Sequence, residues 1–459
     1  MSMPSDFVWG VASAAFQVEG ATTKDGRSPS VWDTFAAKPG NVFGGHTGDP
    51  ACGSYERFEE DAQLIAGLNA SAYRFSIAWP RIIPQADGKV NESGLAYYDR
   101  FIDALLAKGI EPWATLYHWD MPVWQFDRGG WLDRSVSDRF AEYTRAVVDR
   151  LSDRVRHWFT LNEPQVFISH GHLQGNHAPG LNLSRKDALL ATHNALLAHG
   201  KSAQVIRAHA KNPPTIGWAP VGELKTPRSE STADIEAARE ANFGDGIDRW
   251  AYGYPWYCDP VIKGYYPPEM LRAFGTDAPE IKAGDMETIH QPLDFFGVNI
   301  YTSDVVHAGD DGKATPSAPE VGSPITMFRW SVRPESLYWG PKFLYERYGL
   351  PVLVTENGLA SMDWMHSDGC VHDPARIDFL SRYLSQLKRA IQDGTDVRGY
   401  FQWSIMDNFE WAEGYSLRFG LVYMDYQTGE RIPKDSYHWF SEMAASNGAL
   451  LPEHVSELR

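Results

Sequence analysis

The sequence predicts an α/β protein: a single (β/α)8 barrel of the TIM type, with long insertions in the loops that follow the strands. Eight short apolar runs with strand character alternate with longer amphipathic stretches. Several of these runs are apolar throughout, as are strands that are buried on both faces of a parallel sheet. No linker, repeat or low-complexity segment divides the 459 residues. Because barrel domains routinely exceed the usual domain length, we expect one domain over residues 1–459.

The predicted strands are spread over the whole chain. They cover residues 7–11, 72–77, 111–118, 157–161, 215–219, 294–301, 351–356 and 398–404. Strands that alternate with helices pair in parallel, and closing eight such units gives a barrel. An open, doubly wound sheet is the structural alternative. That fold usually carries a GxGxxG phosphate loop after an early strand, and "WGVASAAF" does not match it.

Intervals between the predicted strands contain apolar residues at helical spacing. Residues 55–68 repeat apolar side chains at helical intervals, and residues 94–109 end in Lys-Gly, which is a helix-stop signal. The same pattern predicts helices over 133–151, 185–209 and 373–394. The longest remaining intervals, which we expect to be loop insertions, are 30–50, 222–260 and 303–330.

The composition argues against several classes of function. The chain has 42 Lys plus Arg and 59 Asp plus Glu, a net charge of −17, which repels nucleic acids and anionic membranes. The three cysteines lie far apart and form no CxxC pair, so neither a disulfide framework nor a zinc ribbon is indicated, and we expect a cytoplasmic protein. No apolar run approaches the roughly 18 residues of a membrane span. The early "VWGVASAAF" lacks the preceding basic residues of a signal peptide, and we expect a buried strand and turn there.

Polar and aromatic residues gather at the carboxyl ends of the predicted strands, where barrels of this type carry their active sites. In chain order they are Arg74, His118, Asn162, Glu163, Asn299, Tyr301, Glu356 and Trp403. Few of them are residues that a strand end needs for stability. The chain also has 17 Trp, 21 Tyr and 22 Phe, which fits either a large aromatic core or a concave site lined by flat apolar rings.

Two glutamates stand out among these residues. Pro164 follows Glu163, and we expect it to hold Glu163 in an extended conformation and to begin a helix. Asn357-Gly358 follows Glu356 and permits a tight turn. Either glutamate alone would be a solvated loop acid. Two carboxyl groups that face each other across a barrel mouth are what glycoside hydrolysis needs, because one protonates the leaving oxygen and the other attacks C1 or activates water.

The motifs around these glutamates resemble those of a known family. "TLNEP" (160–164) and "VTENG" (354–358) are similar to the two catalytic signatures of glycoside hydrolase family 1, the retaining β-glycosidases. Further blocks match that family in order: "FVWGVASAAFQVEG", "YRFSIAWPRI", "YHWDMP", "HAPG", "FFGVNIYTS", "WSIMDNFEWAEGYSLRFGLVYMD" and "RIPKDSYHWF". The resemblance therefore covers nearly the whole chain.

The resemblance implies a retaining exo-β-glycosidase, and specifically a β-glucosidase, that works by double displacement without a metal or an organic cofactor. Glu356 would be the nucleophile and Glu163 the acid/base. The implied substrate-binding residues are Gln17, His118, Asn162, Tyr301, Trp330, Trp403, Glu410 and Trp411, with Arg74, Asn299 and Phe419 in support. If Arg74 reaches Glu356, it keeps that carboxylate ionised, and Tyr301 could donate a hydrogen bond to it.

The implied substrates are small β-glycosides or oligosaccharides such as cellobiose. The sequence leaves open a preference for galactose or fucose, because Glu410 can bind an axial or an equatorial 4-hydroxyl. It also leaves open transglycosylation and association into a homo-oligomer. Two positions depart from the family pattern: Val221 stands where many members carry an asparagine, and Ile300 replaces the first residue of a common Tyr-Tyr pair.

Three alternative functions fit the sequence less well. A phospho-β-glucosidase would need a cationic phosphate pocket from residue 409 onward, where Glu410 and Glu413 stand instead. A thioglucosidase of the plant type would lack the acid/base carboxylate that Glu163 supplies. A non-catalytic sugar-binding barrel would not need both glutamates. The histidines of "HGHLQGNH" (170–177) fit no metal-ligand spacing, so no metal site is expected.

Overall fold

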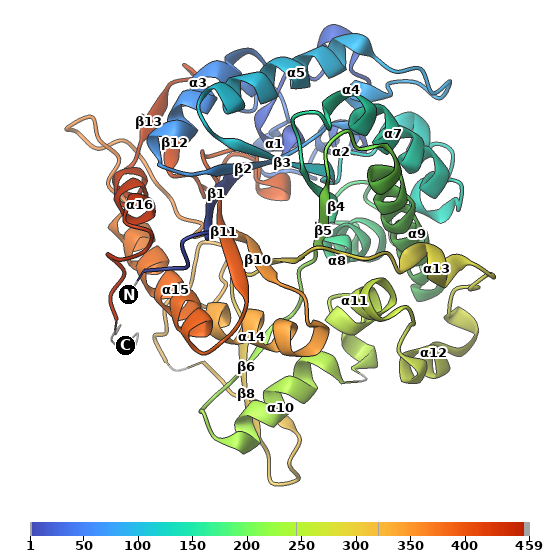
Figure 1. The fold of residues 1–459 in the computed structure, drawn as a ribbon, viewed down its shortest axis with the longest axis vertical. Helices are drawn as coiled ribbons and strands as arrows, with labels where there is room; N and C mark the ends of the chain where they lie inside the picture. The colour runs from blue at the N-terminus through green and yellow to red at the C-terminus, as the bar shows by residue number, and fades with distance from the viewer. Residues whose placement is uncertain (1, 245, 320, 454–459) are drawn as a thin grey trace.

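Eight parallel strands form one sheet in the computed structural model, which describes residues 2–244, 246–319 and 321–453. The sheet order is β5-β4-β3-β2-β1-β11-β10-β7. The strands are β1 (Val8–Ala12), β2 (Ala72–Ser76), β3 (Glu111–Tyr117), β4 (His157–Asn162), β5 (Thr215–Ala219), β7 (Phe296–Asn299), β10 (Val352–Asn357) and β11 (Val397–Trp403). Two backbone hydrogen bonds link the edges beside β5 and β7, from Asp294 N to Ile216 O (2.8 Å) and from Asn299 N to Pro220 O (3.0 Å). The sheet is therefore a nearly closed barrel, and the eight predicted strands are confirmed (Figure 1).

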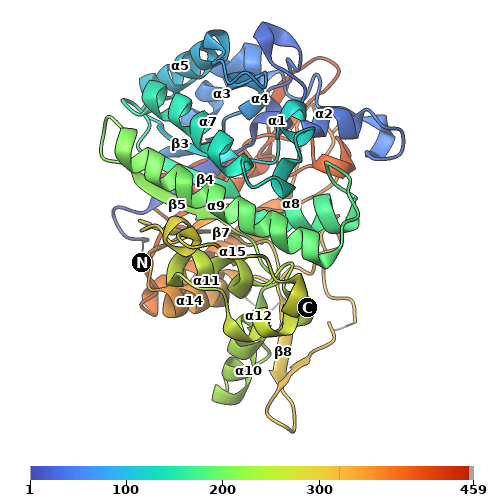
Figure 2. The same ribbon diagram turned by 90° about the vertical axis from the view of Figure 1, so that its right-hand side faces the viewer.

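Helices surround the barrel (Figure 1). The five predicted ones are α3 (Ser54–Gly67), α5 (Glu92–Ala107), α7 (Val136–Leu151), α9 (Arg185–His209) and α15 (Pro374–Gln392). Each begins and ends within three residues of its predicted bounds, because its buried face repeats at helical spacing. In Figure 2, α9 runs along the outside of β4 and β5. No helix in the described part of the chain is long and apolar enough to cross a membrane.

Aromatic rings fill the interior of the barrel. Trp113 lies 5.9 Å from Phe159 and 5.3 Å from Phe401 between ring centroids, and Phe159 lies 5.1 Å from Phe295. The same apolar cluster continues to Trp403 at the end of β11. Part of the high aromatic content is thus core, and this core forms the floor beneath the strand ends.

The predicted loop insertions contain secondary structure of their own. The first holds α2 (Val31–Ala36), the second β6 (Lys225–Pro227), α10 (Thr232–Phe243) and α11 (Tyr254–Lys263), and the third β8 (Asp304–Ala308) and β9 (Ala314–Pro316). β6, β8 and β9 form a separate three-stranded sheet, which projects from the barrel together with α10 (Figures 1 and 2). Strands of three to five residues are too short to show a clear periodicity, so the sequence did not predict them.

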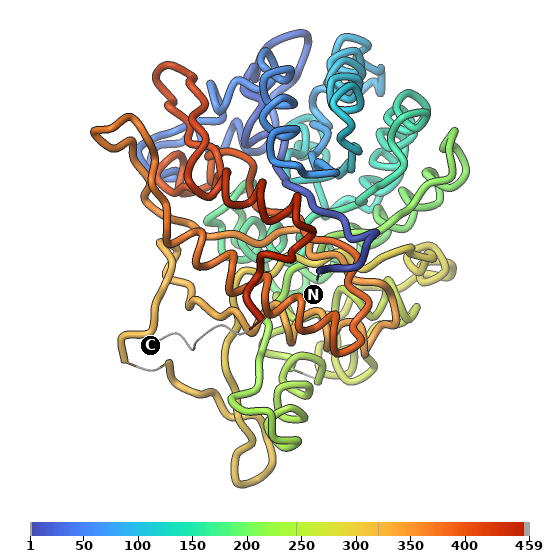
Figure 3. Tube along the Cα trace, turned by 60° about the vertical axis from the view of Figure 1, so that its left-hand side comes forward, coloured from blue at the N-terminus to red at the C-terminus, as the bar shows by residue number. Residues whose placement is uncertain are grey.

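The two ends of the described chain pack together. The backbone N–H of Met3 donates to Asn447 O (2.9 Å), and Trp9 Nε1 donates to Asn447 Oδ1 (3.0 Å). In Figure 3 the blue segment that leads into β1 accordingly lies beside α16 (Asp435–Ala445), in red. The first strand and the last helix thereby close the same side of the barrel.

Candidate active site

A cavity of about 850 Å³ opens at the carboxyl ends of the barrel strands. The predicted site residues that line it are His118, Glu163, Asn299, Tyr301, Trp330, Glu356, Trp403, Glu410, Trp411 and Phe419. Three others, Gln17, Arg74 and Asn162, do not line this cavity, and each is at most 1 % exposed. The structure therefore brings both glutamates to one cavity, with part of the predicted site buried behind its wall.

Glu163 lies at the junction of β4 and the short helix α8 (Pro164–Ile168). Its backbone is left-handed, with φ 45° and ψ 64°, so the prediction of an extended conformation was wrong. Pro164 disfavours the right-handed helical region for the residue before it, and the sharp turn from strand to helix takes the left-handed one. Such a conformation costs about 1–3 kcal/mol and is typical of residues that are held in place at functional sites.

Two donors hold the Glu356 carboxylate at the end of β10. Arg74 Nη1 donates to Oε1 (2.6 Å), and the Tyr301 hydroxyl donates to Oε2 (2.8 Å). The Asn357 side chain donates to Ile300 O (2.8 Å), which ties the end of β10 to the segment after β7. The Glu356 side chain is 5 % exposed, so its orientation is set by protein donors and not by solvent.

Asn162 and Asn299 connect the two glutamates behind the cavity. Asn162 Oδ1 accepts from Arg74 Nη2 (2.6 Å) and from Asn299 Nδ2 (3.1 Å). Asn299 Nδ2 also donates to Glu163 Oε1 (2.7 Å). Arg74 and Asn299 therefore meet on one amide oxygen, and each also holds one of the two carboxyl groups.

The same arrangement fixes the protonation of His118. Because Asn162 Oδ1 is an acceptor, Asn162 Nδ2 is a donor, and it lies 3.1 Å from His118 Nε2. Burial lowers the pKa of His118 well below its usual value, and the positive charge of Arg74 lowers it further. The ring is therefore neutral, accepts at Nε2 and carries its proton on Nδ1. Asn162 has both side-chain groups engaged, so its role in binding the substrate stays a prediction.

The two glutamates differ in how far their surroundings raise the pKa of the carboxyl group. Burial raises the pKa of Glu163 well above its usual value, and the charge of Glu356 raises it further. Burial also raises the pKa of Glu356, but Arg74 and Tyr301 both oppose that shift by stabilising the carboxylate. Glu356 therefore loses its proton first, and Glu163 keeps its proton while Glu356 is charged.

Several buried polar atoms at the site have no hydrogen-bond partner within the described part of the chain. They are Gln17 Oε1, Glu410 Oε2 and His118 Nδ1. Gln17 is held in place by its amide group, which donates to Phe409 O (2.9 Å). Burial, and then the charge of Glu356, raises the pKa of Glu410 to about 8. Because buried polar groups are normally paired, the two unpaired oxygens of Gln17 and Glu410 and the unpaired N–H of His118 suit a ligand that is rich in hydroxyl groups.

Aromatic rings form the wall beside these polar atoms. Trp403 stacks on His118 at 5.8 Å with an interplanar angle of 17°. Trp411 stacks on Phe16 (6.1 Å, 5°) and lies 4.5 Å from Trp119. A cavity that combines flat apolar rings with unpaired polar atoms matches the two-sided chemistry of a pyranose ring, which has C–H faces and a hydroxyl edge.

Much of the outer wall of the cavity is formed by residues that were not predicted from the sequence. His170 and His177 line the cavity with their rings stacked at 4.7 Å, although the sequence indicates no role for them beyond the metal binding that their spacing disfavours. Tyr252 comes from the second insertion, where no motif marks it. Phe328, beside the predicted Trp330, could have been found from the aromatic pair "FRW". Val221 and Ile300, the two positions that depart from the family pattern, also line the cavity.

Comparison with known proteins agrees with this geometry. The sequence model described as glycosyl hydrolase family 1 matches residues 1–449. The chain belongs to glycosyl hydrolase family 1. It is therefore an O-glycosyl hydrolase, and the sequence resemblance stated above is confirmed.

Relatives within this family are similar over nearly their whole length. A 1,4-beta-D-glucan glucohydrolase of Thermotoga neapolitana is 45 % identical, over 97 % of this chain and 98 % of that protein. A beta-glucosidase of an Agrobacterium species is 44 % identical, over 96 % and 95 %. The structure of a Thermotoga maritima beta-glucosidase in complex with glucoimidazole has a TM-score of 0.88 at 43 % identity, covering 97 % of this chain and 99 % of that one.

Proposed function

We propose that this chain is a retaining exo-β-glucosidase that removes terminal non-reducing β-D-glucosyl residues. The observation that carries the proposal is that two buried glutamates line one cavity and that their carboxyl groups have different neighbours. Arg74 and Tyr301 stabilise Glu356 as an anion, whereas Glu163 lies beside that anion and holds its proton. This is the division of labour that double displacement needs.

In the first step, a carboxylate oxygen of Glu356 attacks C1 of the bound sugar. The bond from C1 to the aglycone oxygen breaks, and Glu163 gives its proton to that oxygen, so an alcohol leaves. The product is a glycosyl ester on Glu356. Donation from Tyr301 and Arg74 orients the attacking carboxylate.

In the second step, Glu163 acts as a base. Once Glu356 is esterified its charge is gone, and a cause that raised the pKa of Glu163 disappears with it. Glu163 then takes a proton from water while the water oxygen attacks C1, and the ester bond to Glu356 breaks. Two inversions at C1 return the β-anomer.

A panel of nitrophenyl β-glycosides tests the substrate. We expect kcat/KM to be highest for the β-glucoside, with the β-fucoside and β-galactoside as the second candidates. The β-fucoside is included because a relative from Bifidobacterium breve, 40 % identical, is a bifunctional beta-D-glucosidase/beta-D-fucosidase. Activity on none of these glycosides would overturn the proposal and favour a sugar-binding protein without catalysis.

The pH dependence of kcat/KM should be bell-shaped. Glu356 must be ionised, so activity falls as the pH drops through its pKa. Glu163 must be protonated, so activity falls as the pH rises through its pKa. Because burial raises both pKa values, we expect the optimum to lie above the usual carboxyl range, which is centred at about 4.3 for glutamate. Initial rates across the pH range measure this, and a rate that keeps rising with pH would contradict the acid role of Glu163.

The substrates would be small β-glycosides or oligosaccharides such as cellobiose, and a homo-oligomer stays a prediction. The three cysteines, Cys52, Cys258 and Cys370, are all free, which supports a cytoplasmic location. The 459 residues would act as one catalytic domain.

A further inference from the structure

The loop between β10 and α15 presents an exposed tryptophan. Trp364 is 61 % exposed, and the nearby Met362 is 59 % exposed. The Trp364 ring stacks on His366, with 5.4 Å between centroids and an interplanar angle of 8°. One face of the indole is therefore covered, and the exposure of the side chain leaves the other face to solvent.

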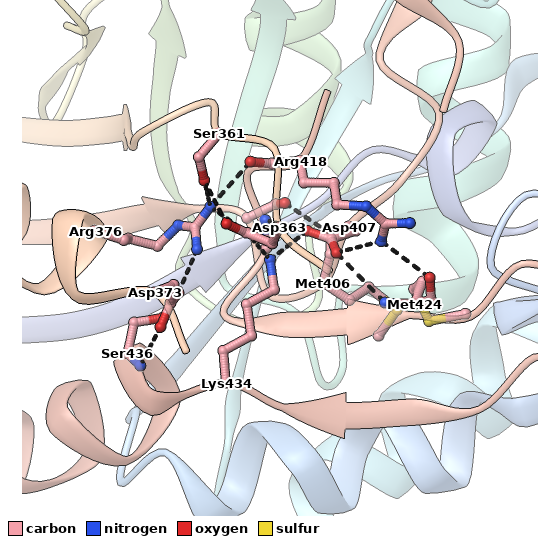
Figure 4. Close-up of polar contacts among 12 residues, drawn as sticks. Ser361, Asp363, Asp373, Arg376, Met406, Asp407, Arg418, Met424, Lys434 and Ser436 are labelled. Atoms are coloured by element: carbon pink, nitrogen blue, oxygen red, sulfur yellow. Dashed lines mark hydrogen bonds and ion pairs between the residues drawn. The ribbon is translucent and has the colours of Figure 1, made fainter. Parts of the chain in front are cut away.

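A network of buried charges fixes the residue directly before Trp364. The Asp363 side chain is 6 % exposed and accepts from Arg376 Nη2 (2.8 Å) and Lys434 Nζ (2.5 Å). Lys434 also donates to Asp407 (2.7 Å), so Asp363 is tied to the segment that leads to Glu410 (Figure 4). A side chain that stands next to a fixed backbone loses little conformational freedom when it binds a ligand.

The two ends of the loop are also held. Ser361 and Arg418 exchange backbone hydrogen bonds of 3.0 and 3.1 Å. At the other end, His372 lies 2.7 Å from Asp435 and 2.9 Å from Asp368 through its two ring nitrogens. Trp364 is thus displayed on a loop that is braced on both sides, whereas loops in general are more mobile than the elements they connect.

This loop adjoins the wall of the catalytic cavity. Ala360 packs in the same apolar cluster as Trp403, and its carbonyl accepts from the Met327 N–H (3.2 Å). Met327 is 44 % exposed and directly precedes Phe328, which lines the cavity. Ala360 and Trp364 are four residues apart, so their Cα atoms are separated by at most about 14 Å. Trp364 is therefore near enough to the cavity wall to be reached by a chain of several sugar units that leaves the cavity.

We propose that Trp364 is a stacking platform for a glucosyl unit of an oligosaccharide whose non-reducing end occupies the catalytic cavity. The C–H face of a pyranose packs on an open aromatic face. The net charge of −17 favours a neutral glucan over an anionic polysaccharide. This inference rests on the proposed function, and it adds a binding site outside the cavity for longer substrates.

A second copy of the chain fits this surface less well. Stable interfaces bury about 800 Å² on each partner. The exposed large apolar side chains of this loop are only Met362, Trp364 and Met365 among its described residues, and an aromatic side chain covers about 150–250 Å² at most. The loop therefore offers a patch of the size of one or two sugar rings.

The test compares substrates of increasing length on Trp364→Ala. With cello-oligosaccharides of two to six glucose units, we expect kcat/KM to be unchanged for the short ones and to fall about fivefold for those long enough to reach Trp364. A fivefold change corresponds to about 1 kcal/mol. Nitrophenyl β-glucoside should be hydrolysed at the wild-type rate. Trp364→Phe keeps an aromatic face and should recover most of the loss.

Met365→Ala is the matched control, because it removes a neighbouring exposed apolar side chain (42 % exposed) but no ring. It should leave the whole series unchanged. Equal kcat/KM at every length in Trp364→Ala, with an active wild type, would overturn the platform and leave the proposed function intact. A wild type inactive on the aryl glucoside would overturn the proposed function itself. A change of oligomeric state in Trp364→Ala, measured by sedimentation, would show a contact between copies and also overturn the platform.

Discussion

Glu356→Gln is expected to abolish hydrolysis of nitrophenyl β-glucoside, with a loss in kcat on the order of 10⁶-fold, the scale seen when a covalent nucleophile is removed. An amide oxygen is a poor nucleophile, so the glycosyl ester does not form. Steady-state rates with the purified variant measure this. Near-normal turnover would show that another group attacks C1.

This result has meaning only if the variant is folded. The glutamine is close in shape to glutamate, and its oxygen can still accept from Arg74 Nη1, so the buried guanidinium keeps a partner. We expect the variant to melt cooperatively, in a transition close to that of the wild type. Glu223→Gln is the matched control, because this carboxylate lies at the outer wall of the same cavity, pairs with Lys225 and should be dispensable.

Glu163→Gly should show a different defect. Loss of a general acid/base costs about 10²- to 10⁴-fold. For an aryl glucoside with a good leaving group, the first step needs little acid help, so the slow step becomes the attack of water on the ester. Azide needs no base, and we expect it to raise the turnover of this variant while leaving the wild type unaffected. The absence of any rescue would contradict the role assigned to Glu163.

The strands and the two glutamates could be predicted from the sequence because their signals are local. A buried parallel strand appears in the sequence as an apolar run, and the short motifs "TLNEP" and "VTENG" each mark the end of a strand. The backbone of Glu163 could not be predicted in the same way. Pro164 excludes one region of conformational space, but the geometry of the turn from β4 to α8 decides between the remaining regions.

Only part of the network behind the cavity could be predicted. The contacts of Arg74 and Tyr301 with Glu356 were expected, but the meeting of Arg74 and Asn299 on the Asn162 oxygen was not. Arg74 meets Asn162 and Glu356 only because the barrel brings β2, β4 and β10 to one end, and no local pattern specifies which atoms pair. Tyr252 and the small sheet of β6, β8 and β9 come from insertions whose short elements have no periodic signal. Nor could the exposed Trp364 be predicted, because exposure is a property of the folded loop.

The configuration of the azide product tests the double displacement most directly. Glu163→Gly in the presence of azide and an activated aryl β-glucoside should release β-glucosyl azide, because Glu356 first inverts C1 and azide then inverts it again. The coupling constant of the anomeric proton in an NMR spectrum distinguishes the two anomers. The account predicts the β-anomer. An α-glucosyl azide would mean that azide attacks the substrate itself, and it would contradict Glu356 as the nucleophile of a retaining enzyme.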